Sequence, residues 1–129
     1  MATSRKPSVL IVDDSRMIKD LLRTLLSNDG YSVLGEASDG IDAVMKCLEL
    51  KPDIVLLDIN MDKMDGIKAL EEMRKAVPST MVLMVSGTSN LAMVKDALSK
   101  GAAGFIVKPI VPASVLDKIS TCWKARKNK

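Results

Sequence analysis

The sequence predicts an α/β domain in which a parallel sheet of five strands is covered by helices on both faces. Short aliphatic runs alternate with segments of helical spacing five times along the chain. Most of these runs are continuously apolar, which is typical of parallel strands buried on both faces. The chain has 129 residues, 47% of them hydrophobic, so we expect a single domain over residues 1–129 with its core at about residues 7–125.

Four of the apolar runs are expected to form strands buried on both faces: Val9 to Val12, Ile54 to Leu57, Met81 to Val85 and Phe105 to Val107. A fifth segment, Tyr31 to Ala37, is less uniformly apolar and suits an edge of the sheet. Because no run is long enough to span a bilayer and no signal-peptide core precedes the first strand, we expect no membrane insertion and a cytoplasmic location.

Five segments between these runs carry the spacing of amphipathic helices. The first ends at a capping signal at residues 28–30, and the next three stop near Pro52, Pro78 and Gly101. Pro112 suits the first turn of the fifth helix. The apolar stripes contain, in chain order, Met17, Ile18, Leu21, Leu22, Leu25 and Leu26; Ile41, Val44, Met45 and Leu48; Ile67, Leu70, Met73 and Val77; Leu91, Val94 and Leu98; and Leu116, Ile119 and Trp123.

The composition argues against several classes of protein. Cys47 and Cys122 lie far apart and the chain has no His, so a disulfide framework or a Cys/His zinc site is not expected, and both thiols are expected to be free. The net charge of +3 is modest. The basic run at residues 124–129 is typical of a solvated chain end, and we expect no nucleic-acid binding.

Polar side chains follow four of the five expected strands. Asp13 and Asp14 come after the first strand, Asp58 after the third, Ser86 after the fourth and Lys108 after the fifth. Any one of them alone is typical of a cap or a turn. Because the carboxyl ends of parallel strands meet at one edge of the sheet, where ligands bind, we expect the five side chains to lie close together.

Such a group of side chains predicts a site at which a metal ion assists the transfer of a phosphoryl group. Three neighbouring carboxylates repel one another unless one keeps its proton or a cation joins them. Oxygen ligands favour a hard ion such as Mg²⁺, which leaves room for a phosphate oxygen. A carboxylate can attack phosphorus to form an aspartyl-phosphate. Lys108 and the metal would then stabilise the charge on the phosphoryl oxygens, and the Ser86 hydroxyl would donate a hydrogen bond to one of them.

The same residues resemble the receiver domains of bacterial two-component signalling, the CheY-like family, from about Pro7 to about Ala125. The resemblance implies a flavodoxin-like (βα)5 fold with the strand order 2-1-3-4-5. The matching motifs are Val-Asp13-Asp14-Ser, Leu-Leu-Asp58-Ile-Asn-Met, Met64-Asp65-Gly66, Val-Ser86-Gly and Phe105-Ile-Val-Lys108-Pro109.

The resemblance also implies a role for each acidic residue. Asp58 is implied to be the phosphoacceptor, taking the group from the phosphohistidine of a sensor histidine kinase or from a small acyl phosphate. Asp14, Asp58 and the backbone carbonyl of Asn60 are implied to ligate Mg²⁺, with Asp13 acting through water. The protein is then a phosphoacceptor that catalyses its own phosphotransfer and dephosphorylation, rather than a conventional enzyme.

The resemblance further implies a switch. Lys108 pairs with the phosphoryl group and forms a cis peptide bond with Pro109, while Ser86 and Phe105 move together and alter the surface of the fourth helix, fifth strand and fifth helix. The implied targets are a flagellar motor switch in chemotaxis or the next carrier of a phosphorelay. The signal ends by autodephosphorylation or through an external phosphatase.

Five positions modify this pattern. Asp62 stands where the family commonly has proline, which puts an extra negative charge beside the acceptor. Ser86 and Gly87 replace the commoner threonine and alanine and keep a hydroxyl and a small neighbour. Asn60 and Thr88 occupy places that tune dephosphorylation in the family.

Two other functions are compatible with these residue types. A small aspartate-nucleophile phosphatase of the haloacid dehalogenase type would also use Asp, Mg²⁺, Ser or Thr, and Lys, although its nucleophile belongs to an Asp-x-Asp motif after the first strand. A receiver fold that works as a phosphorylation-independent interaction module is the other alternative. Steady turnover of a phosphate ester would identify the first, and absence of phosphorylation the second.

Overall fold

The computed structural model describes residues 6–61, 64–87 and 90–126, and these contain five strands that alternate with five helices. Asp62 and Thr88 lie outside the described residues. The elements are β1 (Ser8–Val12), α1 (Arg16–Asn28), β2 (Ser32–Ala37), α2 (Gly40–Leu50), β3 (Ile54–Asp58), α3 (Gly66–Ala76), β4 (Met81–Ser86), α4 (Leu91–Ser99), β5 (Gly104–Val107) and α5 (Pro112–Arg126).

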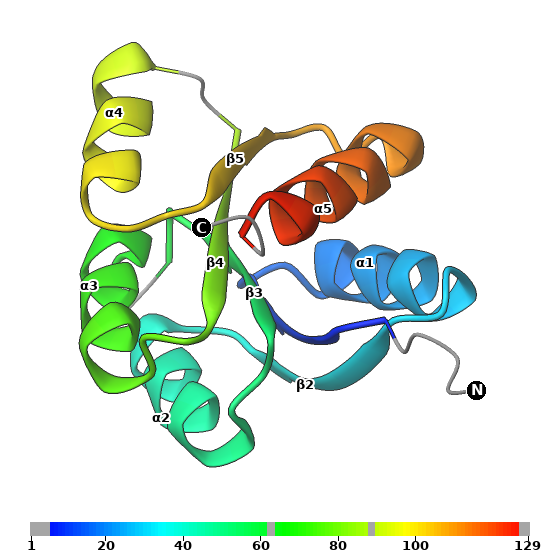
Figure 1. Cartoon of the computed structure of the whole chain (residues 1–129), viewed down its shortest axis with the longest axis horizontal. Helices are drawn as coiled ribbons and strands as arrows, with labels where there is room; N and C mark the ends of the chain where they lie inside the picture. The colour runs from blue at the N-terminus through cyan, green and yellow to red at the C-terminus, as the bar shows by residue number, and fades with distance from the viewer. Residues whose placement is uncertain (1–5, 62–63, 88–89, 127–129) are drawn as a thin grey trace.

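The strands form one parallel sheet in the order β2-β1-β3-β4-β5. Helices α1 and α5 cover one face, and α2, α3 and α4 cover the other (Figure 1). This is the flavodoxin-like arrangement that the sequence resemblance implied. Strand order reverses between β1 and β3, so the carboxyl ends of these two strands form the edge where a ligand site is expected.

Two apolar layers, one on each face of the sheet, form the core. Alternate side chains of the central strands point to opposite faces, so Leu10 and Leu57 pack with α2 and α3 while Ile11 and Leu56 pack with α1 and α5. Residues in β1, β3 and β4 are buried almost throughout, as expected for central parallel strands. The strand expected at Phe105 to Val107 is present as β5, but its expected burial on both faces is wrong, because β5 is at the sheet edge and Val107 is 46% exposed.

Most of the apolar stripe of α2 lies on the surface, and of its four residues only Val44 packs against the core. The helix instead packs through small side chains, Ala43 and Cys47, which allow its backbone to lie close to the sheet and to α3. Helix α4 behaves in the same way, since Ala97 is buried. The large apolar residues left exposed on the two helices are Ile41, Met45, Leu48, Leu91 and Leu98.

The expected helix boundaries agree with the structure. Gly30 adopts a φ of +92° just after α1, and Gly101 a φ of +108° just after α4, a left-handed conformation that glycine adopts readily. Helix α5 begins at Pro112. None of the helices within the described part of the chain combines the length and apolarity needed to cross a membrane.

Candidate functional site

Three carboxylates meet at the edge where β1 and β3 end. Asp13 and Asp14 follow β1, and Asp58 is the last residue of β3 rather than the residue after it. The register pairs Val12 with Leu57, which brings the ends of the two strands to the same level. One oxygen from each of the three carboxylates lies within 4.8 Å of the others. Asp13 and Asp58 are almost fully buried, whereas Asp14 is exposed.

Lys108 lies against two of these carboxylates. Its ammonium nitrogen is 3.0 Å from Oδ2 of Asp13 and 3.6 Å from Oδ1 of Asp58. Burial opposes the charged form of Lys108, but the hydrogen bond to Asp13 and the negative charges of Asp13, Asp58 and Asp14 outweigh it, so the pKa of Lys108 lies above its usual value. Lys108 therefore stays protonated and offsets part of the negative charge.

The Asp58 carboxyl is held in an environment that disfavours its ionisation. Burial raises its pKa to about 6, and the neighbouring charges of Asp13 and, less, Asp14 add to the effect. The ammonium of Lys108 and the backbone N–H of Asn60, which hydrogen-bonds the carboxyl, oppose this rise without cancelling it. One cation is thus too little for three carboxylates, and a further cation would be stabilised there.

Strands β4 and β5 bring Ser86 and Lys108 together through a backbone hydrogen bond. Ser86 is the last residue of β4 and is fully buried. Its carbonyl accepts a hydrogen bond of 2.7 Å from the backbone N–H of Lys108. The bond between Lys108 and Pro109 is cis, as the resemblance implied. Phe105 is half-buried on β5, where it pairs with Met84 and packs against the layer under α2, α3 and α4.

The chain after Asp58 is fixed against the site by α3. The Asp65 carboxylate caps α3 by accepting a hydrogen bond of 2.9 Å from the backbone N–H of Lys68. The N–H of Gly66 donates to the carbonyl of Ile59 over 2.7 Å. A Cβ atom on Gly66 would lie 2.4 Å from the carbonyl oxygen of Asp58, so only glycine fits this close approach of two backbones.

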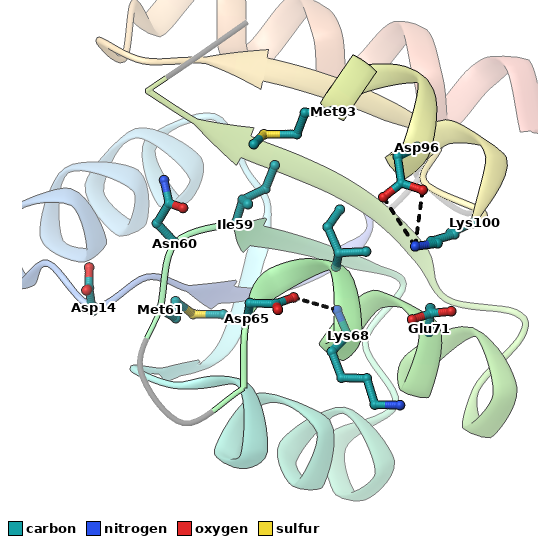
Figure 2. Close-up of a pocket in the computed structure, with 11 residues that line it drawn as sticks. Asp14, Ile59, Asn60, Met61, Asp65, Lys68, Glu71, Met93, Asp96 and Lys100 are labelled. Atoms are coloured by element: carbon teal, nitrogen blue, oxygen red, sulfur yellow. Dashed lines mark hydrogen bonds and ion pairs between the residues drawn. The ribbon is translucent and has the colours of Figure 1, made fainter. Parts of the chain in front are cut away.

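A hollow of about 800 Å³ leads away from the acidic edge between α3 and α4. Asp14 and Asn60 lie at one end of it, and Asp96 and Lys100, which form an ion pair of 3.1 Å, lie at the other (Figure 2). Met61 points into it near the acidic end. The hollow leaves the acidic edge open to solvent from this side.

A buried lysine was missed in the sequence. Lys19 is only 6% exposed, and its ammonium donates a hydrogen bond to the hydroxyl of Ser38, in the loop that follows β2. The residue before Ser38, Ala37, accepts a hydrogen bond of 3.1 Å from the backbone N–H of Asp13. Lys19 thus joins α1 to the loop beside the acidic edge. The available signal was its position three and seven residues before Leu22 and Leu26, on the buried side of α1.

The acidic edge fits Mg²⁺ by its donor atoms and charge. All three side chains offer carboxylate oxygens, and the chain has no histidine that would favour a softer metal. Asp13 and Asp58 are buried with only Lys108 as a cationic partner among the described residues. A divalent cation would remove the remaining repulsion, and the exposed Asp14 keeps one side of the edge open to water.

Comparison with known proteins gives one consistent result. A model of the response regulator receiver domain matches residues 9–120. The chemotaxis protein CheY of Thermotoga maritima is 43% identical over 116 residues, covering 90% of this chain and 97% of that protein. CheY of Listeria monocytogenes is 40% identical over 116 residues, covering 90% of this chain and 98% of that protein.

Solved structures agree with the sequence relatives. CheY of Borrelia burgdorferi, in a crystal structure of its complex with CheX, BeF3 and Mg²⁺, has a TM-score of 0.88 and 39% sequence identity to this chain. The match covers 90% of this chain and 88% of that one. A CheY-like receiver domain of Methanospirillum hungatei has a TM-score of 0.87 at 31% identity and covers 98% of this chain and 100% of that one.

Proposed function

Because the chain belongs to the response regulator receiver family, we propose that it is a receiver that is switched by Mg²⁺-dependent phosphorylation of Asp58. The convergence of Asp13, Asp14, Asp58 and Lys108 at one edge of the sheet is the observation that carries the proposal. The relatives named CheY support a role in two-component signalling, with chemotaxis as the leading pathway, and we place the protein in the cytoplasm.

In the proposed reaction an oxygen of the Asp58 carboxylate attacks phosphorus and forms a new O–P bond. With acetyl phosphate the bond between phosphorus and the bridging oxygen breaks, and its electron pair leaves with acetate. With a histidine kinase the P–N bond of the phosphohistidine breaks, and its electron pair stays on the imidazole nitrogen. Hydrolysis of the resulting acyl phosphate, unaided or through an external phosphatase, returns the carboxylate and ends the signal.

The residues around Asp58 prepare this reaction in different ways. Asp14, Asp58 and the backbone carbonyl of Asn60 would hold Mg²⁺, with Asp13 bound through water; when bound, the ion supplies positive charge to the phosphoryl oxygens. Lys108, held by Asp13, places its ammonium beside Asp58, where it would stabilise the same oxygens. The neutralised surroundings would keep the Asp58 carboxyl ionised and therefore nucleophilic.

We propose that Ser86 and Phe105 transmit the change. Ser86 is tied to Lys108 through the backbone. Phe105 lies on β5, the edge strand that leads to Lys108, and is half-buried against the apolar layer on the side of α2, α3 and α4. Phosphoryl oxygens that attract the Ser86 hydroxyl and Lys108 favour one arrangement of this region, which is a shift of populations between two states. The surface of α4, β5 and α5 would then bind a target such as a flagellar motor switch or a phosphorelay protein. Its exposed apolar residues include Leu91 and Leu98 of α4 and Val107 of β5.

Metal binding is testable without phosphorylation. We expect Mg²⁺ to bind the protein with one-to-one stoichiometry by isothermal titration calorimetry, and Asp14→Asn to weaken this binding at least about tenfold because one of three anionic oxygens is lost. Asp117→Asn, which removes an exposed carboxylate on α5, is the matched control and should bind like the wild type. Equal affinities for the three proteins would remove Asp14 from the metal site.

Lys108→Ala separates phosphorylation from switching. We expect this variant to bind Mg²⁺ and to accept the phosphoryl group more slowly, but to show almost none of the wild-type amide shifts in α4 and β5 in ¹⁵N-correlated NMR spectra after acetyl phosphate is added. Lys75→Ala, on the exposed side of α3, should show the full shifts. Full shifts in the phosphorylated Lys108→Ala protein would exclude Lys108 from the switch.

A further inference from the structure

The edge of the sheet opposite the acidic site carries two hollows that share one arginine. One hollow, of about 480 Å³, opens at the amino ends of β1, β2 and β3, and the other, of about 490 Å³, at the amino ends of β4 and β5. Arg126, at the end of α5, lines both of them. We call this surface the basic face and define it by Lys51, Arg74 and Arg126.

The cations of the basic face are available to an outside partner. Among the described residues, no carboxylate forms an ion pair with Lys51 or Arg126. Lys51 adopts a φ of +48° at the end of α2, a conformation that glycine usually supplies at this position. The Arg126 guanidinium lies over the Trp123 ring at 3.4 Å from its centroid, which fixes its position. Stacking leaves the N–H groups in the plane of the guanidinium able to donate to a partner.

Arg74 is held in place by neutral groups. One of its terminal nitrogens donates hydrogen bonds of 2.8 Å to the carbonyls of Pro78 and Thr80. The side chain also lies against Gly101, where an added Cβ atom would approach the Arg74 Nε to 2.9 Å. The guanidinium is therefore ordered without losing its charge, and its second terminal nitrogen can serve a carboxylate of a partner.

The acidic groups nearby do not neutralise this surface. Asp29 forms an ion pair of 2.9 Å with Lys6, at the rim of the first hollow. Asp53 accepts hydrogen bonds from the backbone N–H and the hydroxyl of Ser8, over 3.0 and 3.2 Å. Asp53 keeps its negative charge, because its partners in Ser8 are neutral, and it lines the first hollow together with Lys51 and Arg126. The charges of Lys51, Arg74 and Arg126 outnumber that one carboxylate, so the basic face keeps a net positive charge.

The walls of the hollows indicate which kind of anion fits. Leu50 and Trp123 line the first hollow, and Leu98 and Ala102 the second, so each recess accepts an apolar side chain beside the cations. A bilayer surface is disfavoured because Leu50 and Trp123 are partly buried and Ala102 is buried, so that of these four only Leu98 is exposed. Single-stranded nucleic acid is disfavoured because Arg126 already covers a face of the Trp123 ring, on which a base would stack.

We propose that the basic face docks an acidic segment of a partner protein, with carboxylates on Lys51, Arg74 and Arg126 and apolar side chains in the two hollows. The volumes of the hollows lie in the range that holds side-chain-sized ligands. Docking at this face leaves the phosphorylation edge uncovered, because the two lie at opposite ends of the strands. It goes beyond the proposed switch and does not depend on phosphorylation of Asp58.

The test uses the full chain and a fluorescein-labelled synthetic peptide of repeated Glu-Glu-Leu units, followed by fluorescence anisotropy. We expect saturable binding that weakens with added salt and that is lowered about tenfold in the Lys51→Glu/Arg126→Glu double variant. The double variant Lys95→Glu/Lys118→Glu makes the same change of net charge elsewhere and should keep the wild-type affinity. Asp58→Asn should bind the peptide as the wild type does.

Mapping the peptide-binding site on the wild-type protein gives a result that does not depend on whether the variants fold. Peptide-induced amide shifts in ¹⁵N-correlated NMR spectra should gather around Lys51, Arg74, Ala102 and Arg126. Lack of saturable binding, shifts elsewhere, or equal losses in both double variants would overturn the proposal. Phosphatidylserine vesicles or oligothymidine that bind more tightly than the peptide, with the same sensitivity to Lys51→Glu/Arg126→Glu, would overturn the assignment to a protein partner.

Discussion

Asp58→Asn should stabilise the metal-free protein while removing its phosphoacceptor. Burial and Asp13 hold the pKa of the Asp58 carboxyl at about 6, against 3.8 in an unperturbed group, so ionisation of Asp58 opposes folding. That difference corresponds to a gain on the order of 2–3 kcal/mol in the free energy of unfolding when the charge is removed. Urea unfolding in EDTA at about pH 7.5 measures this gain.

The gain should depend on pH in a defined direction. Below 3.8 the carboxyl is protonated in both states and contributes no difference. Between 3.8 and about 6 the unfolded chain has released the proton that the folded protein keeps, so the stability of the wild type falls as pH rises through this window. The advantage of Asp58→Asn should therefore be small near pH 4 and complete above about pH 6.5.

Mg²⁺ provides the internal control for this experiment. Saturating Mg²⁺ should raise the stability of the wild type, because the ion binds the folded state, and should raise that of Asp58→Asn much less. Asp117→Asn should follow the wild type under all conditions. If Asp58→Asn were less stable than the wild type in EDTA at neutral pH, the conclusion that the ionised Asp58 carboxylate destabilises the folded protein would be wrong.

Gly66→Ala should be among the most disruptive small substitutions in the chain. The added methyl group would lie 2.4 Å from the carbonyl oxygen of Asp58 and 2.5 Å from Cα of Ile59, and both are backbone atoms that cannot rotate away. We expect a loss of about 3 kcal/mol in the free energy of unfolding, together with weaker Mg²⁺ binding because the chain after Asp58 must shift.

Gly87→Ala is the matched control for Gly66→Ala. A Cβ atom on Gly87 meets no atom within 4 Å, so the same chemical change should alter stability by less than about 0.5 kcal/mol. Urea unfolding and calorimetric Mg²⁺ titration of both variants measure the two effects. Similar stabilities for Gly66→Ala and Gly87→Ala would show that the contact between Gly66 and Asp58 is not as close as described.

Most of the fold follows from local patterns in the sequence. Continuous apolar runs predicted the central strands, and residues such as Gly30, Gly101 and Pro112 fixed helix ends because their backbone preferences are strong. Strand order required the family resemblance, since periodicity does not say which strands are neighbours. The position of β5 was predicted correctly, but its burial on both faces was not, because the exposure of an edge strand depends on which helices cover it.

The acidic edge could be predicted from the sequence because its residues follow strands. Asp13, Asp58 and Lys108 come at the ends of recognisable strands, and parallel strands deliver their ends to one place. Other features depend on contacts between distant segments. The burial of Lys19 and the close approach of Gly66 to Asp58 arise only when the loops and helices are packed. For α2 the predicted buried face was mostly wrong, since the small residues Ala43 and Cys47 make the buried contact and only Val44 of the apolar stripe packs beside them.

Intact-mass measurement after incubation with acetyl phosphate and Mg²⁺ tests the central claim most directly. The wild type should gain one phosphoryl group, and Asp58→Asn should gain none under the same conditions. Added EDTA should suppress labelling of the wild type. Labelling of Asp58→Asn to the same extent, or labelling that EDTA leaves unchanged, would contradict the assignment of Asp58 and its neighbours to a Mg²⁺-dependent phosphorylation site.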